Sequence, residues 1–260
     1  MTDTRQLLSL DGKVAVVTGG AGRYGKVFSR GLAEAGAKVW IASRNGESCS
    51  AYATELRAEG FKADADAMDM TSEDDLRRVR DRILEAEGRI DILVNNAVIR
   101  PMKSYDDDLE HWRESIDVNS TGIFAPTRVF GGVMESQRSG SIINISSIYG
   151  VVSPDLRAYG REGDDVPPDY MFHRSGVLNF TRAMAMRFAR FGVRVNALSP
   201  GGLDEPTIPA KTREFYEARC PMGRFAGPDD VKGALVFLAS DASAYVTGQN
   251  LIVDGGWTIF

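Results

Sequence analysis

Short apolar stretches alternate with longer stretches of helical periodicity along most of the chain, and this alternation restricts the fold more than any other feature. The first unit is an apolar, β-branched run at residues 14–17, a glycine-rich turn, and apolar residues at helical spacing that end at Gly36. The unit then recurs several times. Strands that alternate with helices of this length predict a parallel sheet with helices on both faces and right-handed crossovers.

The recurring pattern gives a set of expected elements. We predict further strands at residues 39–42, 63–67, 90–95, 141–145, 193–198 and 250–253, and helices at residues 47–58, 72–86, 109–134, 170–191 and 229–239. The fold class is therefore α/β: a doubly wound parallel sheet (Rossmann fold) of about seven strands with helices on both faces. No linker or long-period repeat interrupts it, so we expect one dinucleotide-binding and catalytic domain over residues 1–260.

Two stretches rich in Pro, Gly and Asp, residues 151–169 and 201–211, break this pattern. Each follows a predicted strand, at the carboxyl edge where open α/β sheets bind their ligands. We expect the segments 151–169 and 201–220 to lie on the substrate side.

Composition excludes several classes of function. The net charge is −5 with no block of Lys or Arg, so we expect no nucleic acid partner. No apolar run approaches the roughly 20 residues that span a bilayer, so we expect no membrane partner. Cys49 and Cys220 lie far apart and accompany two histidines, which gives no metal-ligand spacing. Free thiols of this kind suit a cytoplasmic protein.

The turn after the first strand contains Gly19, Gly20, Gly22 and Gly25. Glycines here let the backbone approach a pyrophosphate, whose charge is stabilised by N–H groups at the helix N-terminus. Such a turn can also be an ordinary tight connection. Its place in the first βαβ unit favours dinucleotide binding.

The cofactor is predicted from the end of the second strand. NAD-binding units place an acid about 20 residues beyond the turn, whereas an Arg there accommodates the 2′-phosphate of NADP. This chain has Ser43 and Arg44 and no acid at that point, which favours NADP(H) over NAD(H). The alternative for Arg44 is a solvated loop charge.

Tyr170 is the candidate acid/base. Hydride transfer from an alcohol needs a group that takes the hydroxyl proton, and a tyrosine needs a nearby cation to do so at neutral pH. Arg174 lies four residues later, on the same face of the predicted helix. Tyr159 competes for this role, but Gly163 follows it at the same spacing and no helical pattern continues. A tyrosine with a purely structural role in the core is the other alternative.

Motifs in a fixed order connect these features. They are the turn at residues 18–25, Asp69, Asn95-Asn96-Ala97, Asn119, Ser147, Tyr170, Ser199-Pro200-Gly201, and the segments 246–249 and 254–256. With them, the chain from Gly12 to Trp257 resembles the short-chain dehydrogenase/reductase family.

The resemblance implies roles for individual residues. Asn119, Ser147, Tyr170 and Arg174 would be catalytic: Ser147 donates a hydrogen bond to the substrate oxygen, and Asn119 supports a water path behind the cation. The implied cofactor-binding residues are Gly19, Gly22, Arg23, Tyr24, Gly25, Ser43, Arg44, Asp69, Met70, Asn96, Ala97, Tyr170, Arg174, Pro200 and Gly201. The family also implies a homo-oligomer, a tetramer or dimer, assembled through the helices near Asn119 and Tyr170.

The chain departs from the family pattern at several positions. Arg174 replaces a lysine; it keeps the charge, but its planar fork differs from the compact ammonium that also holds the nicotinamide ribose. Arg23 replaces a glycine of the turn, and either it helps hold phosphate or it points to solvent while Gly22 takes the close approach. Val98 replaces a glycine and narrows the space beside the cofactor.

Ser147 and Tyr170 are also further apart than in the family, so an insertion lies within residues 151–169. Its polar residues are Asp155, Arg157, Tyr159, Arg161, Glu162, Asp164 and Asp165. It forms either a wall or lid over the substrate or a solvated surface loop.

These features predict an NADP(H)-dependent oxidoreductase that interconverts an alcohol and a carbonyl on a small-molecule substrate. A sugar, sugar acid or polyol is the expected class, by fold-level analogy. The alternative, suggested by Arg174 and Arg23, is a nucleotide-binding sensor or scaffold that kept the fold and lost turnover.

Overall fold

A seven-stranded parallel sheet in the order β3-β2-β1-β4-β5-β6-β7 forms the centre of the structure, a computed structural model that describes residues 2–155 and 167–260. The strands are β1 (Val14–Thr18), β2 (Lys38–Ser43), β3 (Ala63–Ala67), β4 (Ile92–Asn95), β5 (Gly140–Ile145), β6 (Val193–Pro200) and β7 (Asn250–Val253). The strands after β1 are added toward one edge of the sheet as far as β3, and from β4 onward they are added toward the other edge. This switch in strand order between β1 and β4 opens a crevice at their carboxyl ends. The predicted doubly wound α/β fold is confirmed.

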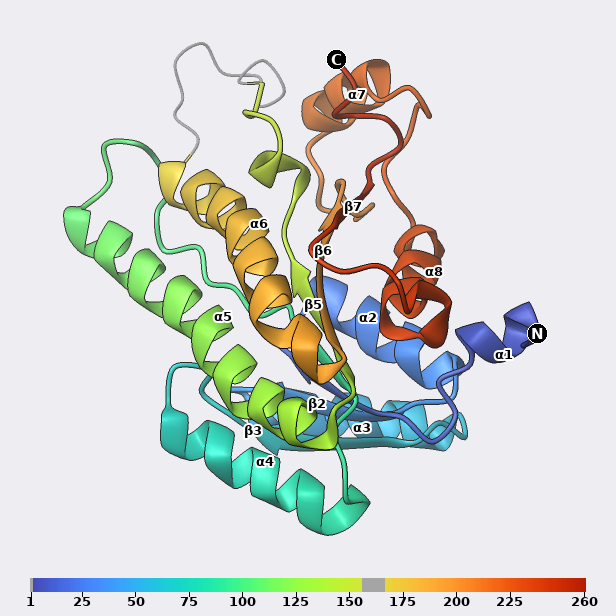
Figure 1. Cartoon of the computed structure of the whole chain (residues 1–260). Helices are drawn as coiled ribbons and strands as arrows, with labels where there is room; N and C mark the ends of the chain where they lie inside the picture. Colours follow the sequence, from blue (N-terminus) through green and yellow to red (C-terminus); the bar gives the residue numbers. More distant parts are fainter. Residues whose placement is uncertain (1, 156–166) are drawn as a thin grey trace.

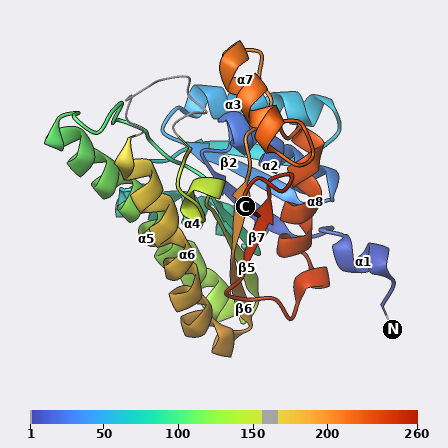
Figure 2. The same cartoon turned by 90° about the horizontal axis from the view of Figure 1, so that it is seen from above.

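Helices cover both faces of this sheet. They are α1 (Thr4–Leu8), α2 (Arg23–Glu34), α3 (Gly46–Ala58), α4 (Glu73–Glu87), α5 (Leu109–Gln137), α6 (Pro168–Phe188), α7 (Ala210–Arg219) and α8 (Pro228–Ala239). α4, α5 and α6 pack on one face, and α2, α3 and α8 on the other (Figures 1 and 2). Within the described residues, no helix is long and apolar enough to cross a membrane.

Strand β1 shows why the central strands are recognisable in the sequence. Val14 and Val16 pack in the core under α4, α5 and α6, whereas Ala15 and Val17 pack in the core under α2, α3 and α8. Since both faces are buried, residues 14–17 are all apolar and form a continuous hydrophobic run.

Two helices were not predicted. α1 buries no residue, and α7 buries only Tyr216, so neither has a clear apolar stripe. α7 begins inside the stretch expected to be irregular. The Tyr216 ring stacks between Phe225 and Trp257, with centroids 3.8 and 4.4 Å away, and this stack holds α7 above the carboxyl edge of the sheet.

A buried polar network joins the sheet to the helices that carry the site. Asn95 Nδ2 donates to Asn144 Oδ1 at 2.8 Å and to Thr127 Oγ1 of α5 at 3.0 Å. Asn144 Nδ2 in turn donates to Thr181 Oγ1 of α6 at 2.9 Å. Hydrogen bonds in such an interior fix one arrangement of the elements, because an unpaired member is costly.

Replacing the central member of this network should destabilise the fold. Asn144→Ala removes the partner of Asn95 and of Thr181 in the interior, so we expect the free energy of unfolding to fall by about 3 kcal/mol. Urea denaturation measures it. The matched control is Asn179→Ala, an exposed position of α6, which should change it by less than about 0.5 kcal/mol. Equal effects at the two positions would contradict the structural role.

Candidate active site

The carboxyl ends of β1, β4, β5 and β6 open into a cavity of about 1640 Å³. Most of the predicted site residues line it: Gly19, Gly22, Arg23, Tyr24, Ser43, Arg44, Met70, Asn96, Ala97, Ser147, Tyr170, Arg174, Pro200 and Gly201. Gly25, Asp69 and Asn119 are not among the lining residues. The cavity therefore joins the glycine turn to Tyr170 in one space.

The turn after β1 has the shape that a dinucleotide needs. Gly19 has φ +62°, a conformation that favours glycine. A Cβ on Gly25 would lie 2.0 Å from the Gly19 carbonyl oxygen, so Gly25 allows α2 to pack directly on the turn. Gly22 begins α2 with no side-chain cap, which leaves the first N–H groups available for an anion. These residues fit a pyrophosphate.

Asn96 fixes that turn from β4. Its Nδ2 donates to the carbonyl oxygens of Thr18 and Gly19 at 3.0 and 3.1 Å. The Thr18 hydroxyl oxygen accepts the N–H groups of Asn96 and Ala97 at 3.0 and 3.1 Å. The ends of β1 and β4 are thus held together beside the crevice.

Arg23 and Tyr24 connect the start of α2 to the segment after β6. The Arg23 guanidinium forms an ion pair with Glu205 while its side chain stays 62% exposed. The Tyr24 hydroxyl donates to the Gly201 carbonyl at 2.7 Å. The sequence suggested that Arg23 either helps to hold phosphate or points to solvent. It gave no sign of the ion pair with Glu205, because the two residues lie far apart in the chain.

The end of β2 carries Ser43 and Arg44 into the cavity, with Arg44 exposed. Asp69 accepts the N–H and the hydroxyl of Thr71 at 2.8 and 2.7 Å. Burial raises the pKa of Asp69, but these hydrogen bonds and the charge of Arg44 lower it overall. At the end of β2, the side chain that lines the cavity beside Ser43 is thus the cation Arg44 and not a carboxylate.

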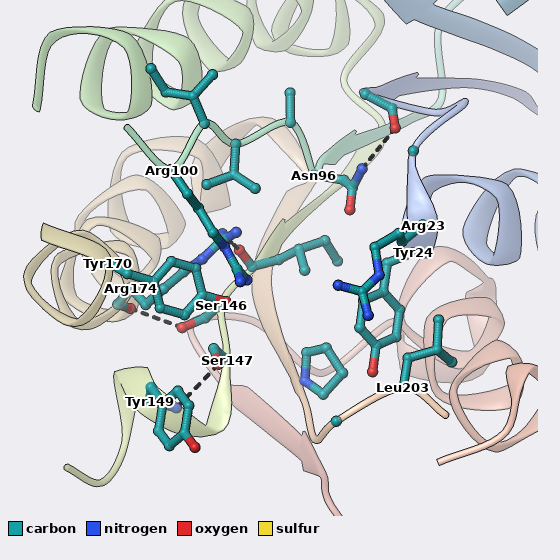
Figure 3. Close-up of a pocket in the computed structure, with 18 of the residues that line it drawn as sticks. Arg23, Tyr24, Asn96, Arg100, Ser146, Ser147, Tyr149, Tyr170, Arg174 and Leu203 are labelled. Carbon is teal, nitrogen blue, oxygen red and sulfur yellow. Dashed lines mark hydrogen bonds between the residues drawn. The ribbon is translucent and has the colours of Figure 1, made fainter. Parts of the chain in front are cut away.

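Tyr170 lies close to two guanidinium groups (Figure 3). The guanidinium carbons of Arg174 and Arg100 are 5.1 and 4.2 Å from the centre of its ring. Burial alone raises the pKa of Tyr170, but the charges of Arg174 and Arg100 and the Ser147 hydroxyl outweigh it and lower the pKa to about 8. Sequence reasoning missed Arg100, whose only signal was its position shortly after a predicted strand.

Arg174 is fixed by the end of β5. Its Nη1 donates to the Ile145 carbonyl oxygen, and its Nε is buried without a hydrogen-bond partner among the described residues. The Ser146 hydroxyl donates to the Arg174 carbonyl oxygen at 2.8 Å. The replacement for lysine therefore keeps its charge beside Tyr170 but is bound to the backbone through its fork.

Ser147 is positioned by a short 3₁₀ turn, η1 (Ile148–Gly150). Its hydroxyl oxygen accepts the N–H of Tyr149 at 3.2 Å (Figure 3). A Cβ on Gly150 would lie 2.6 Å from the Arg174 carbonyl oxygen, so the turn packs directly against α6. This contact brings Ser147 to the Tyr170 side of the cavity.

Asn119 supports the loop after β4. Its Oδ1 accepts the Ile99 N–H at 2.9 Å, and its Nδ2 donates to the Ile99 carbonyl at 3.1 Å and to Ser115 Oγ at 3.0 Å. Ser115 donates to Oδ2 of the buried Asp169 at 2.5 Å. Val98, next to this anchor, also lines the cavity.

Most of the insertion, including Tyr159 and the other polar residues at 157–165, lies outside the described residues. Asp155 is described, and it pairs with Arg219 of α7 at 3.4 Å. The beginning of the insertion thus reaches the helix of the second substrate-side segment.

Comparisons with known proteins agree with this geometry. A family model described as enoyl-(acyl carrier protein) reductase matches residues 24–258. A 3-oxoacyl-(acyl-carrier-protein) reductase of Thermotoga maritima is 35% identical, over 97% of this chain and 100% of that protein. The cis-4-hydroxycyclohexanecarboxylate dehydrogenase of Sinomonas cyclohexanicum is 38% identical, over 95% of this chain and 96% of that one.

Among solved structures, a gluconate 5-dehydrogenase from Burkholderia cenocepacia in complex with NADP and tartrate superimposes with a TM-score of 0.90. It is 32% identical, and the match covers 99% of this chain and 100% of that chain. The relatives are dehydrogenases and reductases that act on alcohol or carbonyl groups. The chain is accordingly an NAD(P)-dependent oxidoreductase, and it belongs to the short-chain dehydrogenase/reductase family.

Proposed function

We propose that the protein is an NADP(H)-dependent oxidoreductase that interconverts an alcohol and a carbonyl on a small polar substrate, with Tyr170 as the acid/base. The observation that carries this proposal is the Tyr170 phenol beside two arginines, in the same cavity as the glycine turn. Positive charge favours the phenolate, so the group can exchange a proton near neutral pH.

Proton transfer follows from the position of each side chain. The glycine turn would hold the pyrophosphate of a nicotinamide dinucleotide, which would supply or accept the hydride. In oxidation, the Tyr170 phenolate takes the hydroxyl proton of the substrate, and in reduction its phenol returns one. The Ser147 hydroxyl donates a hydrogen bond to the substrate oxygen. Arg174 remains charged in both directions, so it stabilises the phenolate without carrying the proton.

Other titratable groups near Tyr170 are less suited to the role. Burial raises the pKa of Tyr24, and it raises the pKa of Tyr216 to about 12. Burial and the charge of Arg174 lower the pKa of His173 to about 3, so its imidazole is neutral. Of these four groups, Tyr170 is thus the one suited to exchange a proton near neutral pH.

The proposed preference for NADP(H) over NAD(H) is supported by Arg44 at the end of β2 and by the NADP complex of the related gluconate 5-dehydrogenase. A sugar, sugar acid or polyol is the proposed substrate class, in line with relatives named for gluconate and for a hydroxycyclohexanecarboxylate. The sensor or scaffold alternative is not favoured, because the named relatives are enzymes.

The proposal includes a single cytoplasmic domain that assembles as a homo-oligomer, a tetramer or dimer. Large apolar side chains on the two helices near Asn119 and Tyr170 support assembly: Phe124 of α5 and Phe172 of α6 are 47% and 62% exposed. A second copy packed on these helices would cover them.

The pH dependence of turnover tests the role of Tyr170. Because its pKa is about 8, kcat/KM for alcohol oxidation should rise with pH and level off above about 8, and kcat/KM for reduction should fall above the same point. Arg174→Met should move the midpoint of this pH profile to higher pH. Arg174→Lys keeps the positive charge and should leave the midpoint near its wild-type pH. Rates are followed by nicotinamide absorbance over a panel of polyols, aldoses and sugar acids.

Tyr170→Phe is the control for this experiment. It should lower turnover by roughly 10²–10⁴ at every pH while nucleotide affinity is retained. Unchanged turnover in this variant would refute the assignment of the acid/base. If Arg174→Lys also loses its turnover, the hydrogen bond from the guanidinium to the Ile145 carbonyl oxygen is needed in addition to the positive charge.

The cofactor preference is tested at Arg44. In wild type, NADPH should bind more tightly than NADH, and Arg44→Asp should weaken NADPH binding by about tenfold or more while improving NADH binding. Fluorescence titration gives both affinities. Arg113→Asp, an exposed arginine of α5, makes the same charge change away from this strand end and should leave the ratio as it was. Equal or weaker NADPH binding in wild type would exclude the NADP assignment.

A further inference from the structure

Arg100 provides a cation on the substrate side of the cavity. It follows β4 and lines the cavity together with Tyr170, Ser147 and Arg174. Figure 3 shows its side chain reaching over Tyr170, with the guanidinium carbon 4.2 Å from the ring centre. An anion bound by this guanidinium would lie next to the group proposed to exchange the proton.

No carboxylate pairs with Arg100 among the described residues, whereas two other arginines of the cavity already have partners. Arg23 is paired with Glu205, and Arg174 is buried on the Ile145 carbonyl. Asp169, the acid that lines the cavity, has one oxygen bonded to Ser115. Arg100 is therefore the arginine near Tyr170 whose fork remains available to a ligand.

The backbone holds Arg100 in place before any ligand binds. The Asn119 side chain accepts a hydrogen bond from the N–H of Ile99, the residue before Arg100, and donates one to the Ile99 carbonyl oxygen. The Arg100 carbonyl oxygen accepts a hydrogen bond from Lys103 Nζ at 2.9 Å. A side chain that starts from a fixed backbone loses less freedom on binding, which strengthens recognition.

We infer that Arg100 binds a carboxylate of the substrate, so that the enzyme selects small hydroxy or keto acids over neutral alcohols of the same shape. This inference rests on the proposed function and specifies its substrate class. A guanidinium matches the two oxygens of a carboxylate with two parallel hydrogen bonds. Seated there, the substrate presents a nearby hydroxyl or carbonyl to Tyr170 and Ser147.

The charges favour a monoanion over a dianion such as a phosphate ester. With Tyr170 as the phenolate, one carboxylate balances the two positive charges of Arg100 and Arg174. A dianion would leave excess negative charge beside the phenolate, and a like charge disfavours its ionised form.

Ligand binding to the nucleotide complex tests the inference without turnover. Calorimetry on the NADPH complex, and again on the NADP⁺ complex, would compare gluconate with sorbitol and threonate with threitol. In each pair, one carboxylate of the acid replaces one hydroxymethyl group of the neutral partner. In wild type we expect each acid to bind at least about tenfold more tightly than its neutral partner. Arg100→Met should remove this ratio, and Arg100→Lys, with a point charge in place of the fork, should keep part of it.

Arg113→Met is the matched control, since it makes the same change at an exposed arginine of α5 that does not line the cavity, and it should keep the wild-type ratio. Nucleotide affinity and thermal unfolding show that each variant is folded; if Arg100→Met is not, Arg100→Lys gives the answer. An equal affinity for acids and neutral partners in wild type overturns the inference. So does an acid preference that survives in Arg100→Met, or tighter binding of glycerol 3-phosphate than of the acids.

Failure of this inference differs from failure of the proposed function. A protein that binds acids through Arg100 but transfers no hydride in either direction would retain the anion site and lose the proposed function. If wild type shows no preference for acids, and both wild type and Arg100→Met turn over neutral alcohols equally well, the inferred anion site is refuted while the proposed function stands.

Discussion

The pairing of the partly buried Tyr170 phenol with positive charge is the interaction on which the proposed chemistry of this protein depends. Burial alone raises the pKa of Tyr170, and only the nearby charges of Arg174 and Arg100, with the Ser147 hydroxyl, lower it to about 8. Tyr24, in the same cavity but with its hydroxyl bonded to a backbone carbonyl, shifts in the opposite direction. The two guanidinium groups, together with Ser147, thus distinguish the surroundings of Tyr170 from those of Tyr24.

Three segments that meet at the carboxyl edge of the sheet surround this pair: α6, the glycine turn and the loop that carries Arg100. α6 carries Tyr170 and Arg174, and the Asn144 hydrogen bond to Thr181 ties that helix to the central strands. Asn96 clamps the glycine turn beside the end of β4, and Asn119 fixes the loop that carries Arg100. Each anchor is a side-chain amide that bonds to a neighbouring segment, from a buried position in Asn144 and Asn119 and a partly buried one in Asn96, so displacement would leave polar groups unpaired.

Sequence periodicity was sufficient for the central strands of the sheet, because both of their faces are buried and their apolar runs are nearly continuous. The spacing of Tyr170 and Arg174 and the place of the glycine turn indicated a site at the sheet edge, and the family resemblance added Ser147. α7 was missed because it buries only Tyr216. Arg100 and the Arg23–Glu205 pair were missed because they depend on contacts between distant segments, which no local pattern encodes.

The central claim is that Tyr170 ionises readily because of its surroundings, and the tyrosinate absorbance of the protein measures this directly. A pH titration of the wild-type spectrum minus that of Tyr170→Phe isolates this one residue. The account predicts a single transition near pH 8 in the difference spectrum. A transition at about pH 10 or above, where an unperturbed tyrosine ionises, would contradict it.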